Sequence, residues 1–389
     1  MLRNLDLIDS FEGRQVLIRC DLNVPISNSE IQDSGRIVAA YKTIDEVIAK
    51  NGRPVICSHL GRPDGVDANY SLKPVFEFMK SKYPDLEFAD SAPATGALTL
   101  IENLRFNESE TSKNDSDREQ FAKDLLGEIT DVVIDGFGVV HRKQASVYEV
   151  AKFADVYAGR TVEKELEVLK KLTENPERPY TLILGGSKVS DKLGVIDALL
   201  PKVDRMLIGG GMMFTFLKAM GHEVGSSLLE EDQIETAAEY IQRAKQLGVE
   251  ILLPVDVVVA EKFDREASHQ TVSADQFNSS RFGETGMGLD IGPETGRVFA
   301  DAISSSKTVF WNGPMGVFEF DNFAAGTKIV AKALSEMDGF SVVGGGDSAS
   351  AVRHFGFQDN AFGHISTGGG ASLEYLEGKK LPGLEALND

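Results

Sequence analysis

The fold is decided by the stretch Thr181-Leu-Ile-Leu-Gly-Gly-Ser-Lys-Val-Ser-Asp-Lys192. Its four opening residues favour a buried strand, and Gly185 and Gly186 end that strand. Lys188 and Lys192 follow four residues apart, and we expect them to share one face of a helix. Glycines that allow close approach, N–H groups at a helix start and two ammonium groups form a cradle for phosphate. The stretch therefore predicts a strand, a turn and a helix that bind an anion.

Three further apolar runs in the second half of the chain end in the same way. Glycine triplets follow them at 209–211, 344–346 and 368–370. In an open α/β sheet, ligands bind at the carboxyl ends of the strands. Four glycine-rich strand ends therefore predict one large site for an anionic ligand.

Composition narrows the class of protein. A chain of 389 residues favours two domains, and its 42% hydrophobic and 26% charged residues are typical of a globular protein. The net charge of −20 argues against nucleic acids and anionic membranes as partners. Cys20 and Cys57 are too few for a disulfide framework, and we expect buried thiols. The start has no apolar segment and no stretch has the ~18 apolar residues of a membrane span, so we expect a cytoplasmic protein.

Strands alternate with helices in both halves, which indicates βαβ units and parallel sheets. We predict strands at 16–20, 54–58, 98–101 and 132–135, then at 181–184, 206–208, 251–255, 308–311, 341–343 and 364–367. Helices are predicted near 36–50, 73–82 and 117–128.

The segment 161–173 lies between the halves. Val162, Leu166, Leu169 and Leu172 form one apolar stripe, and the prolines at 176 and 179 stop the helix. We interpret it as a rigid inter-domain helix; the alternative is a surface helix of one large domain.

Basic residues follow the strands of the first half. Asp21 and Asn23 come after the first strand and Arg36 opens the next helix, while His59, Arg62, Arg105, His141 and Arg142 follow later strands. Four arginines and two histidines are thereby predicted at one sheet edge of an acidic protein. Guanidinium groups bind phosphate and carboxylate in pairs of hydrogen bonds. The expected ligand is a small molecule with an anionic group at each end and a hydroxyl.

The second half contains no Walker A motif. Residues 344–349 match a G-x-G-x-x-A dinucleotide pattern loosely, but the acidic residue expected about 20 positions on is missing. We expect Asp347 to bind Mg²⁺ and Glu319 to reach a ribose. His222, His269 and His354 are expected to be solvated, and no His/Cys spacing predicts a metal site.

Nine motifs together resemble phosphoglycerate kinases, in the right order and across essentially the whole chain. They are RCDLNVP, SHLGRP, ENLRF, DGFG with the following HR, GGSKVSDK, GGGM, WNGPMGVFE, GGGDS and STGGGASLE. The resemblance implies two Rossmann-like three-layer αβα domains with mainly parallel sheets, joined by an inter-domain helix and facing across a cleft. It implies a 3-phosphoglycerate domain at 1–160, the helix at 161–174, a nucleotide domain at 175–370 and a segment at 371–389 that returns to the first domain.

The resemblance also implies the site residues. The phosphoglycerate would be held by Asp21, Asn23, Arg36, His59, Arg62, Arg105 and Arg142. The nucleotide would be held by Gly186, Lys188, Lys192, Gly210, Gly288, Asn312, Glu319, Gly345, Gly346, Asp347 and Ser348, with Asp347 as the Mg²⁺ ligand. Arg36, Lys188, Gly346 and Gly369 would act on the transferring group.

The sequence departs from the family pattern at two positions. The family usually has D-A-F-G followed by a small residue and Ala before His-Arg, where this chain has Gly136 and Val140. We expect Gly136 to loosen a turn and Val140 to add bulk beside Arg142.

The reaction implied is reversible transfer of the acyl phosphate of 1,3-bisphosphoglycerate to MgADP, which gives 3-phosphoglycerate and MgATP in glycolysis. Such a transfer needs in-line positioning and charge neutralisation rather than a base, and it would occur when the domains of a hinge-bending monomer close. Two alternatives are a two-domain dehydrogenase of a small acid and a non-catalytic protein that closes on its ligand.

Overall fold

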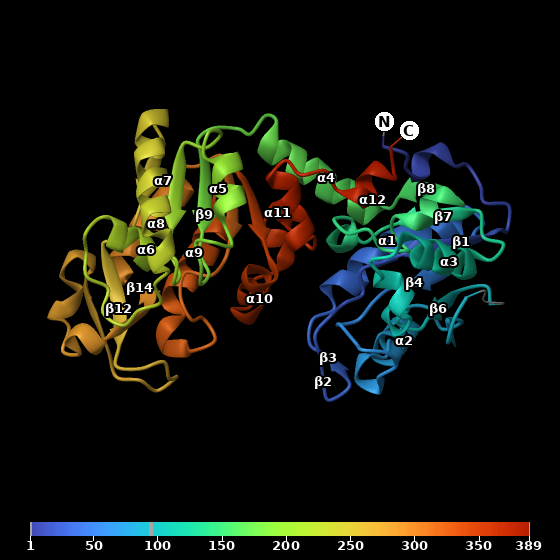
Figure 1. Cartoon of the computed structure of the whole chain (residues 1–389), viewed down its shortest axis with the longest axis horizontal. Coiled ribbons are helices and arrows are strands. Elements are labelled where there is room, and N and C mark those ends of the chain that lie inside the picture. The colour runs from blue at the N-terminus through green and yellow to red at the C-terminus, as the bar shows by residue number, and fades with distance from the viewer. Residues whose placement is uncertain (1, 93–95, 389) are drawn as a thin grey trace. The chain divides into compact units, whose positions relative to one another are not determined.

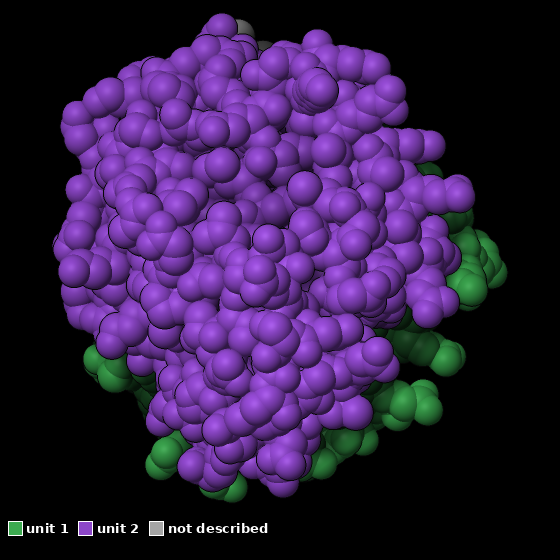
Figure 2. Space-filling model, turned by 90° about the vertical axis from the view of Figure 1, so that its left-hand side faces the viewer, with its two compact units in different colours: residues 1–167, 370–375, 379–389 green, residues 168–369, 376–378 purple. Residues whose placement is uncertain are grey.

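The computed structural model describes residues 2–92 and 96–388. The chain divides into two compact units (Figure 2). Unit 1 holds residues 1–167, 370–375 and 379–389, and unit 2 holds residues 168–369 and 376–378. Each unit is described by itself below.

Unit 1 is built on a parallel sheet in the order β5-β6-β4-β1-β7-β8 (Figure 1). Its strands are β1 (Gln15–Arg19), β4 (Arg53–Cys57), β5 (Glu87–Ala89), β6 (Thr99–Ile101), β7 (Asp131–Ile134) and β8 (Asp155–Ala158). Helices α1 (Gly35–Ala49), α2 (Lys73–Lys80) and α3 (Asp115–Leu126) belong to this part of the chain. All four residues of β7 are buried, as expected for a sheet that is covered on both faces.

Shorter elements complete unit 1. The hairpin of β2 (Ile26–Ser27) and β3 (Glu30–Ile31) turns at Asn28 and Ser29, both with positive φ. Its 3₁₀ helices are η1 (Leu5–Leu7), η2 (Ala68–Tyr70), η3 (Leu104–Phe106), η4 (Glu108–Thr111), η5 (Phe137–Val139) and η6 (Glu149–Lys152).

Unit 2 contains a second parallel sheet, in the order β11-β10-β9-β15-β16-β17 (Figure 1). Its strands are β9 (Tyr180–Leu184), β10 (Arg205–Ile208), β11 (Glu250–Leu252), β15 (Thr308–Asn312), β16 (Phe340–Gly344) and β17 (His364–Ile365). The helices are α5 (Leu193–Leu199), α6 (Met213–Ala219), α7 (Ile234–Leu247), α8 (Pro293–Ser304), α9 (Ala325–Glu336) and α10 (Gly346–His354). The short helices η7 to η11 span Glu231–Gln233, Ala274–Ser279, Gly283–Thr285, Asp321–Phe323 and Asp359–Ala361.

Unit 2 also carries a three-stranded antiparallel sheet that the sequence did not predict. It consists of β12 (Asp256–Ala260), β13 (His269–Ser273) and β14 (Met287–Ile291). The strand predicted at 251–255 is confirmed only at its start, because β11 stops before Pro254 and β12 begins a separate sheet. Proline lacks the N–H that would continue the ladder.

The parallel α/β class predicted for both halves is confirmed. The predicted strand ends agree with the structure to within one or two residues, apart from the segment at 251–255. The short strands β5 and β8 were not predicted. Cys20 and Cys57 are free and buried, as expected. Within 2–92 and 96–388, no helix combines the length and the apolar character needed to cross a membrane.

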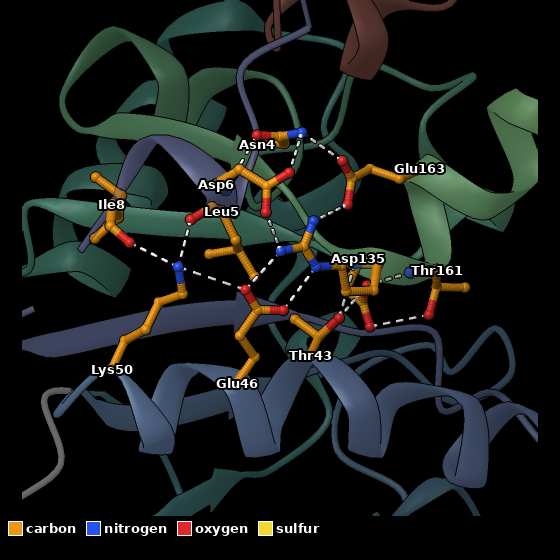
Figure 3. A network of polar contacts seen from close by, with 11 residues as sticks. Asn4, Leu5, Asp6, Ile8, Thr43, Glu46, Lys50, Asp135, Thr161 and Glu163 are labelled. Carbon is orange, nitrogen blue, oxygen red and sulfur yellow. Dashed lines mark hydrogen bonds and ion pairs between the residues drawn. The ribbon is translucent and has the colours of Figure 1, made fainter. Parts of the chain in front are cut away.

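Helix α4 (Arg160–Thr173) confirms the helix predicted at 161–173, and the division between the units falls within it, after Glu167. A polar network in unit 1 holds its first turn (Figure 3). The guanidinium of Arg160 pairs with Asp6, Glu46 and Glu163 at 2.5–2.6 Å.

Asp135 lies at the end of β7 in the same network (Figure 3). Its carboxylate accepts hydrogen bonds from Thr43 Oγ1 at 2.7 Å, from Thr161 N at 2.9 Å and from Thr161 Oγ1 at 3.1 Å. Burial raises the pKa of Asp135 to about 7. One carboxyl group therefore joins β7, α1 and the start of α4.

The last part of the chain belongs to unit 1. Helix α11 (Gly370–Leu376) starts there and α12 (Pro382–Glu385) lies there entirely. Leu2 forms an antiparallel bridge with Asn388, and Arg3 N donates to Leu387 O at 2.9 Å. The two terminal segments are thus paired with each other within unit 1.

Candidate substrate sites

The basic residues of the first half gather around the ends of neighbouring strands. Strands β4, β1 and β7 are adjacent, so the segments that follow them lie at one edge of the sheet. We call the basic cluster the six residues Arg19, Arg36, His59, Arg62, Arg105 and Arg142. Arg19 is the last residue of β1, Arg36 lies in the first turn of α1, and Arg105 lies in η3.

Asp21 and Asn23 organise this cluster. Arg36 Nη1 lies 3.1 Å from Asp21 Oδ2 and donates to Asn23 O at 3.0 Å. Asn23 Oδ1 accepts from Gly61 N at 2.9 Å, and Arg105 Nη1 donates to Gly61 O at 2.5 Å. The loop after β1, the turn after β4 and η3 are therefore hydrogen-bonded to one another.

The electrostatics of the cluster reflect its surplus of cations. Burial lowers the pKa of His59 well below its usual value, and Arg19, Arg105, Arg36 and Arg142 lower it further. Burial lowers the pKa of Arg105 to about 10, with added repulsion from Arg19 and a weaker opposing effect of Glu110. Arg105 Nε is buried and has no hydrogen-bond partner among the residues that the structure describes. Guanidinium groups that repel one another and an unused buried donor are features of a site for an anion.

The two departures from the family pattern do not act as expected. Val140 is fully buried and packs on Gly383, whose N donates to Val140 O at 2.8 Å. Arg142 is exposed, and its Nε donates to His141 Nε2 at 3.0 Å. The expectation that Val140 crowds Arg142 is therefore wrong, because Val140 supports the C-terminal segment instead.

Gly136 does not loosen a turn either. A Cβ at this position would lie 2.9 Å from Asp21 N and 3.1 Å from Cys20 C. The backbone after β7 thus lies directly against the backbone that carries Asp21, and the glycine permits this close approach.

In unit 2, the four glycine-rich ends meet at one edge of a sheet, as predicted. The four ends follow β10, β9, β16 and β17. Strand β15, which ends at Asn312, lies between β9 and β16 in the sheet. A pocket of about 640 Å³ adjoins this edge. Its lining includes Gly186, Gly210, Gly288, Glu319 and Asp347 among the predicted residues, and Met213, Phe214, Leu228, Leu289 and Val317 as an apolar part.

Gly288 shapes the apolar part of this pocket. A Cβ at Gly288 would lie 2.1 Å from Phe214 Cζ and 2.9 Å from Val257 Cγ1. Gly288 N donates to Ser227 Oγ at 2.9 Å. Ser226, Ser227 and Phe263 also line the pocket, and no sequence motif singled them out.

The prediction that Lys188 and Lys192 share a helix face is wrong. Helix α5 begins only at Leu193, and the preceding residues form a loop. Val189 N and Ser190 N donate to Glu230 Oε2 at 2.5 and 3.2 Å, so a carboxylate 40 residues away takes N–H groups that a helix start would offer to phosphate. Glu230 is a residue that no local motif identifies.

The two lysines differ in environment. Lys188 is exposed, whereas Lys192 is half-buried and its ammonium donates to Asn312 Oδ1. Burial lowers the pKa of Lys192, and Asp191 and Asp347 oppose this effect. Lys192 is therefore within electrostatic range of Asp347, at the edge where the glycine-rich ends meet.

Gly346 and Asp347 are the first two residues of α10, and both are exposed. Gly345 has a φ of +87°, and a Cβ built at Gly346 or Gly369 would face open space, with no other part of the described chain within 4 Å beyond the local backbone. Ser348 is fully buried and accepts from Gly313 N at 2.7 Å. Its hydroxyl therefore holds the turn after β15. His269 and His354 are exposed, as expected.

A sheet edge rich in arginine and a glycine-lined pocket at a second sheet edge place the chain among two-unit α/β proteins with candidate sites for anionic ligands. The chain matches the family model described as phosphoglycerate kinase over residues 5–379, and it belongs to the phosphoglycerate kinase family.

Named relatives agree with this assignment. The phosphoglycerate kinase of Leifsonia xyli is 57% identical over 399 residues, which cover 99% of each chain. That of Renibacterium salmoninarum is 52% identical, covering 100% of this chain and 99% of the relative. Among solved structures, phosphoglycerate kinase from Coxiella burnetii matches with a TM-score of 0.86 and 35% identity, covering 100% of this chain and 99% of that one.

Proposed function

We propose that the basic cluster of unit 1 binds the glycerate substrate and that the pocket of unit 2 binds the nucleotide. As a member of its family, the chain catalyses reversible transfer of the acyl phosphate of 1,3-bisphosphoglycerate to ADP, a kinase step of glycolysis that gives 3-phosphoglycerate and ATP. The dehydrogenase and binding-protein alternatives are not favoured by these relatives.

The observation that carries the glycerate assignment is the excess of guanidinium groups over carboxylates in the cluster. Arg105 has an unused buried Nε–H, and the exposed Arg62 and Arg142 can each bind an anionic group. Asp21 and Asn23 are held in place by Arg36 and Gly61 and supply acceptors for a substrate hydroxyl. We infer that these residues bind both charged ends of the glycerate.

The nucleotide assignment rests on the two kinds of surface in the 640 Å³ pocket. The apolar side chains fit a base, and Glu319 offers a carboxylate to ribose hydroxyls. Gly186, Gly210, Gly345, Gly346, Lys188 and Lys192 supply backbone N–H groups and ammonium groups for the phosphates. Asn312 and Ser348 act indirectly, by holding Lys192 and Gly313 respectively.

Asp347 fits a role as the protein ligand of a nucleotide-bound Mg²⁺. It is exposed in the first turn of α10 and lines the pocket. Among the described residues, no group of three or more His, Cys, Asp or Glu side chains is arranged to hold a metal ion. One carboxylate together with phosphate and water oxygens suits Mg²⁺, which would neutralise phosphate charge when bound.

The proposed mechanism uses the residues of the chain for positioning and charge. The attacking group is an ionised phosphate or, in reverse, a carboxylate, so no side chain needs to remove a proton. In-line transfer requires both substrates to meet, so each unit must present its bound substrate to the other during turnover. Arg36 and Lys188 would neutralise the transferring group, and Gly346 and Gly369 would donate backbone N–H groups to it.

The net charge of −20 supports a further proposal that nucleic acids and anionic membranes are not partners. That the protein is a monomer of the cytoplasm stays a prediction.

A coupled assay of 3-phosphoglycerate with MgATP tests the activity, and calorimetry with single ligands tests the assignment. Arg105→Gln should weaken the binding of 3-phosphoglycerate about tenfold or more, the size of a lost charged hydrogen bond, and leave the binding of ADP unchanged. Arg243→Gln makes the same substitution on α7 of unit 2, outside the basic cluster, and serves as the control variant. Equal losses for both ligands in Arg105→Gln would contradict the separation of the sites.

A further inference from the structure

Arg19 lies at the base of the basic cluster with no exposed surface. Its Nε donates to Ser146 Oγ at 2.8 Å and its Nη1 donates to Cys20 O at 2.5 Å. Its Nη2 lies 3.3 Å from His59 Nδ1. The sequence places Arg19 in a motif but does not reveal that the side chain points inward, because arginine is rarely buried.

Glu110 extends this arrangement from the other side. Its carboxylate accepts from Ser146 Oγ at 2.6 Å through Oε1 and from Ser146 N at 3.0 Å through Oε2. Glu110 and Ser146 are both fully buried. The contacts from Glu110 through Ser146 to Arg19 therefore run beneath the site without reaching solvent, and they end at His59.

The donor and acceptor groups determine the direction of each hydrogen bond in this series of contacts. A guanidinium group can only donate, so His59 Nδ1 must accept the bond from Arg19 Nη2. A neutral imidazole that accepts through Nδ1 carries its proton on Nε2. The Ser146 hydroxyl gives its one proton to Glu110 and accepts from Arg19, which requires Glu110 to present an acceptor oxygen.

The charges around His59 also favour its neutral form. The charged groups that bear on it are Arg19 from β1, Arg36 from α1, Arg105 from η3 and Arg142 from the segment after η5, and all four are cations. His59 is itself only 5% exposed. An imidazolium at this position would be repelled by four guanidinium groups and would have no acceptor at Nδ1.

We propose that Glu110, acting through Ser146 and Arg19, fixes His59 as a neutral imidazole with its proton on Nε2. His59 then offers the bound glycerate an uncharged N–H donor of constant orientation. Glu110 and Ser146 are positioning residues, since they act through Arg19. The proposal rests on the proposed glycerate site and adds the protonation state of one of its groups.

Nitrogen-15 NMR of histidine-labelled protein tests the proposal directly. The chain has six histidines, and His59→Gln assigns the signal of His59. We expect an Nε2–H tautomer that does not titrate between pH 5.5 and 8. An Nδ1–H tautomer, or titration with a midpoint near the ordinary value of about 6.5, would overturn the proposal.

Ser146→Ala interrupts the chain of contacts. We expect both His59 tautomers to become populated and the affinity for 3-phosphoglycerate to fall about three- to tenfold, as for one lost hydrogen bond, with nucleotide affinity unchanged. Thr130→Val is the matched control. Thr130 Oγ1 also donates to a carboxylate that is paired with an arginine, since it donates to Asp131 and Asp131 pairs with Arg14. This arrangement lies at the start of β7, the end of that strand away from the basic cluster. An unchanged His59 spectrum in folded Ser146→Ala would contradict the role of Ser146. If that variant does not fold, the spectrum of the unaltered protein still decides.

Addition of 3-phosphoglycerate separates this proposal from the function on which it rests. A shift of the His59 signals at saturation supports the glycerate site, and the tautomer then decides the proposal. Signals that do not move at saturation would contradict the site itself, and with it the donor role of His59.

Discussion

Single residues of the basic cluster owe their behaviour to neighbours that are distant in sequence. Arg36 pairs with Asp21, fifteen positions earlier, and Arg19 contacts Ser146, 127 positions later. A guanidinium that is already held by a carboxylate or a hydroxyl loses little freedom when it meets an anion. The cluster is therefore organised before substrate binds.

Arg36→Ala should lower kcat by about 10² to 10³, because a preorganised cation acts mainly on charge in the transition state. Nucleotide affinity should remain nearly unchanged. Steady-state kinetics with a coupled assay measure kcat, and calorimetry measures the nucleotide affinity. Arg53→Ala is the control, since Arg53 lies at the start of β4 and its Nε donates to Gly13 O. An unaltered kcat would remove Arg36 from the catalytic role.

Gly288→Ala should weaken ADP binding about tenfold, because its Cβ would lie 2.1 Å from Phe214 Cζ and would push that ring into the pocket. Overpacking of this kind also costs roughly 1–3 kcal/mol of stability. Titration with ADP measures the affinity, and titration of the same variant with 3-phosphoglycerate provides the internal control. If ADP binds with its original affinity, the apolar half of the pocket is not where the base lies.

Among the helices and strands, the first turn of α4 is expected to depend on pH through Asp135. The pKa of Asp135 is raised from 3.8 to about 7 by burial, so the folded state binds more protons than the unfolded state between these values. The contribution of Asp135 to stability is therefore greatest below about pH 4 and falls as pH rises to about 7. The difference between the two pKa values corresponds to a loss of at most roughly 4 kcal/mol of unfolding free energy over this pH range.

Asp135→Asn should abolish this part of the pH dependence. An amide can keep the oxygen that accepts from Thr43 and Thr161 N while its nitrogen donates to Thr161 Oγ1. Denaturant unfolding from pH 4 to 8 should give a variant whose loss of stability with rising pH is smaller than in the unaltered protein. Asp115→Asn, at an exposed position, serves as the control. If the unfolding free energies of Asp135→Asn and the unaltered protein fall in parallel as pH rises, Asp135 is not the source of this pH dependence.

Elements defined by local signals could be predicted from the sequence, and those defined by distant contacts could not. The glycine triplets mark the ends of β10 and β16 because glycine interrupts a strand within a few residues. The helix expected over Lys188 and Lys192 fails because Glu230, far along the chain, binds the loop. For the same reason the sequence pointed to the arginines of the proposed glycerate site but not to Glu110 and Ser146 beneath them.

For the whole molecule, the division into two units separates the two proposed ligand sites. Asp347 belongs to unit 2 and the basic cluster to unit 1. Asp347→Ala should weaken MgADP binding about tenfold or more, the size of a lost charged contact, and leave the affinity for 3-phosphoglycerate alone nearly intact. Separate calorimetric titrations measure both. Equal losses for both ligands would contradict the division of labour between the units.

The C-terminal segment should matter for the stability of unit 1. Leu387 is fully buried, whereas Leu7 of the same unit is 63% exposed. Leu387→Ala should cost about 2–5 kcal/mol of unfolding free energy, and Leu7→Ala should cost less than about 0.5 kcal/mol. Denaturant titration compares the two. Similar values would show that the C-terminal segment is not part of the packed core of unit 1.

The pairing of Leu2 with Asn388 also has a consequence for protein synthesis. The ribosome makes the first 167 residues of unit 1, then nearly all of unit 2, and only afterwards residues 379–389. Domains generally fold as units while the chain is being made. Unit 2 can therefore be complete while unit 1, although started earlier, still lacks the partner of its first residues. Translation that stops before residue 379 leaves its defect in the half of the protein that was made first.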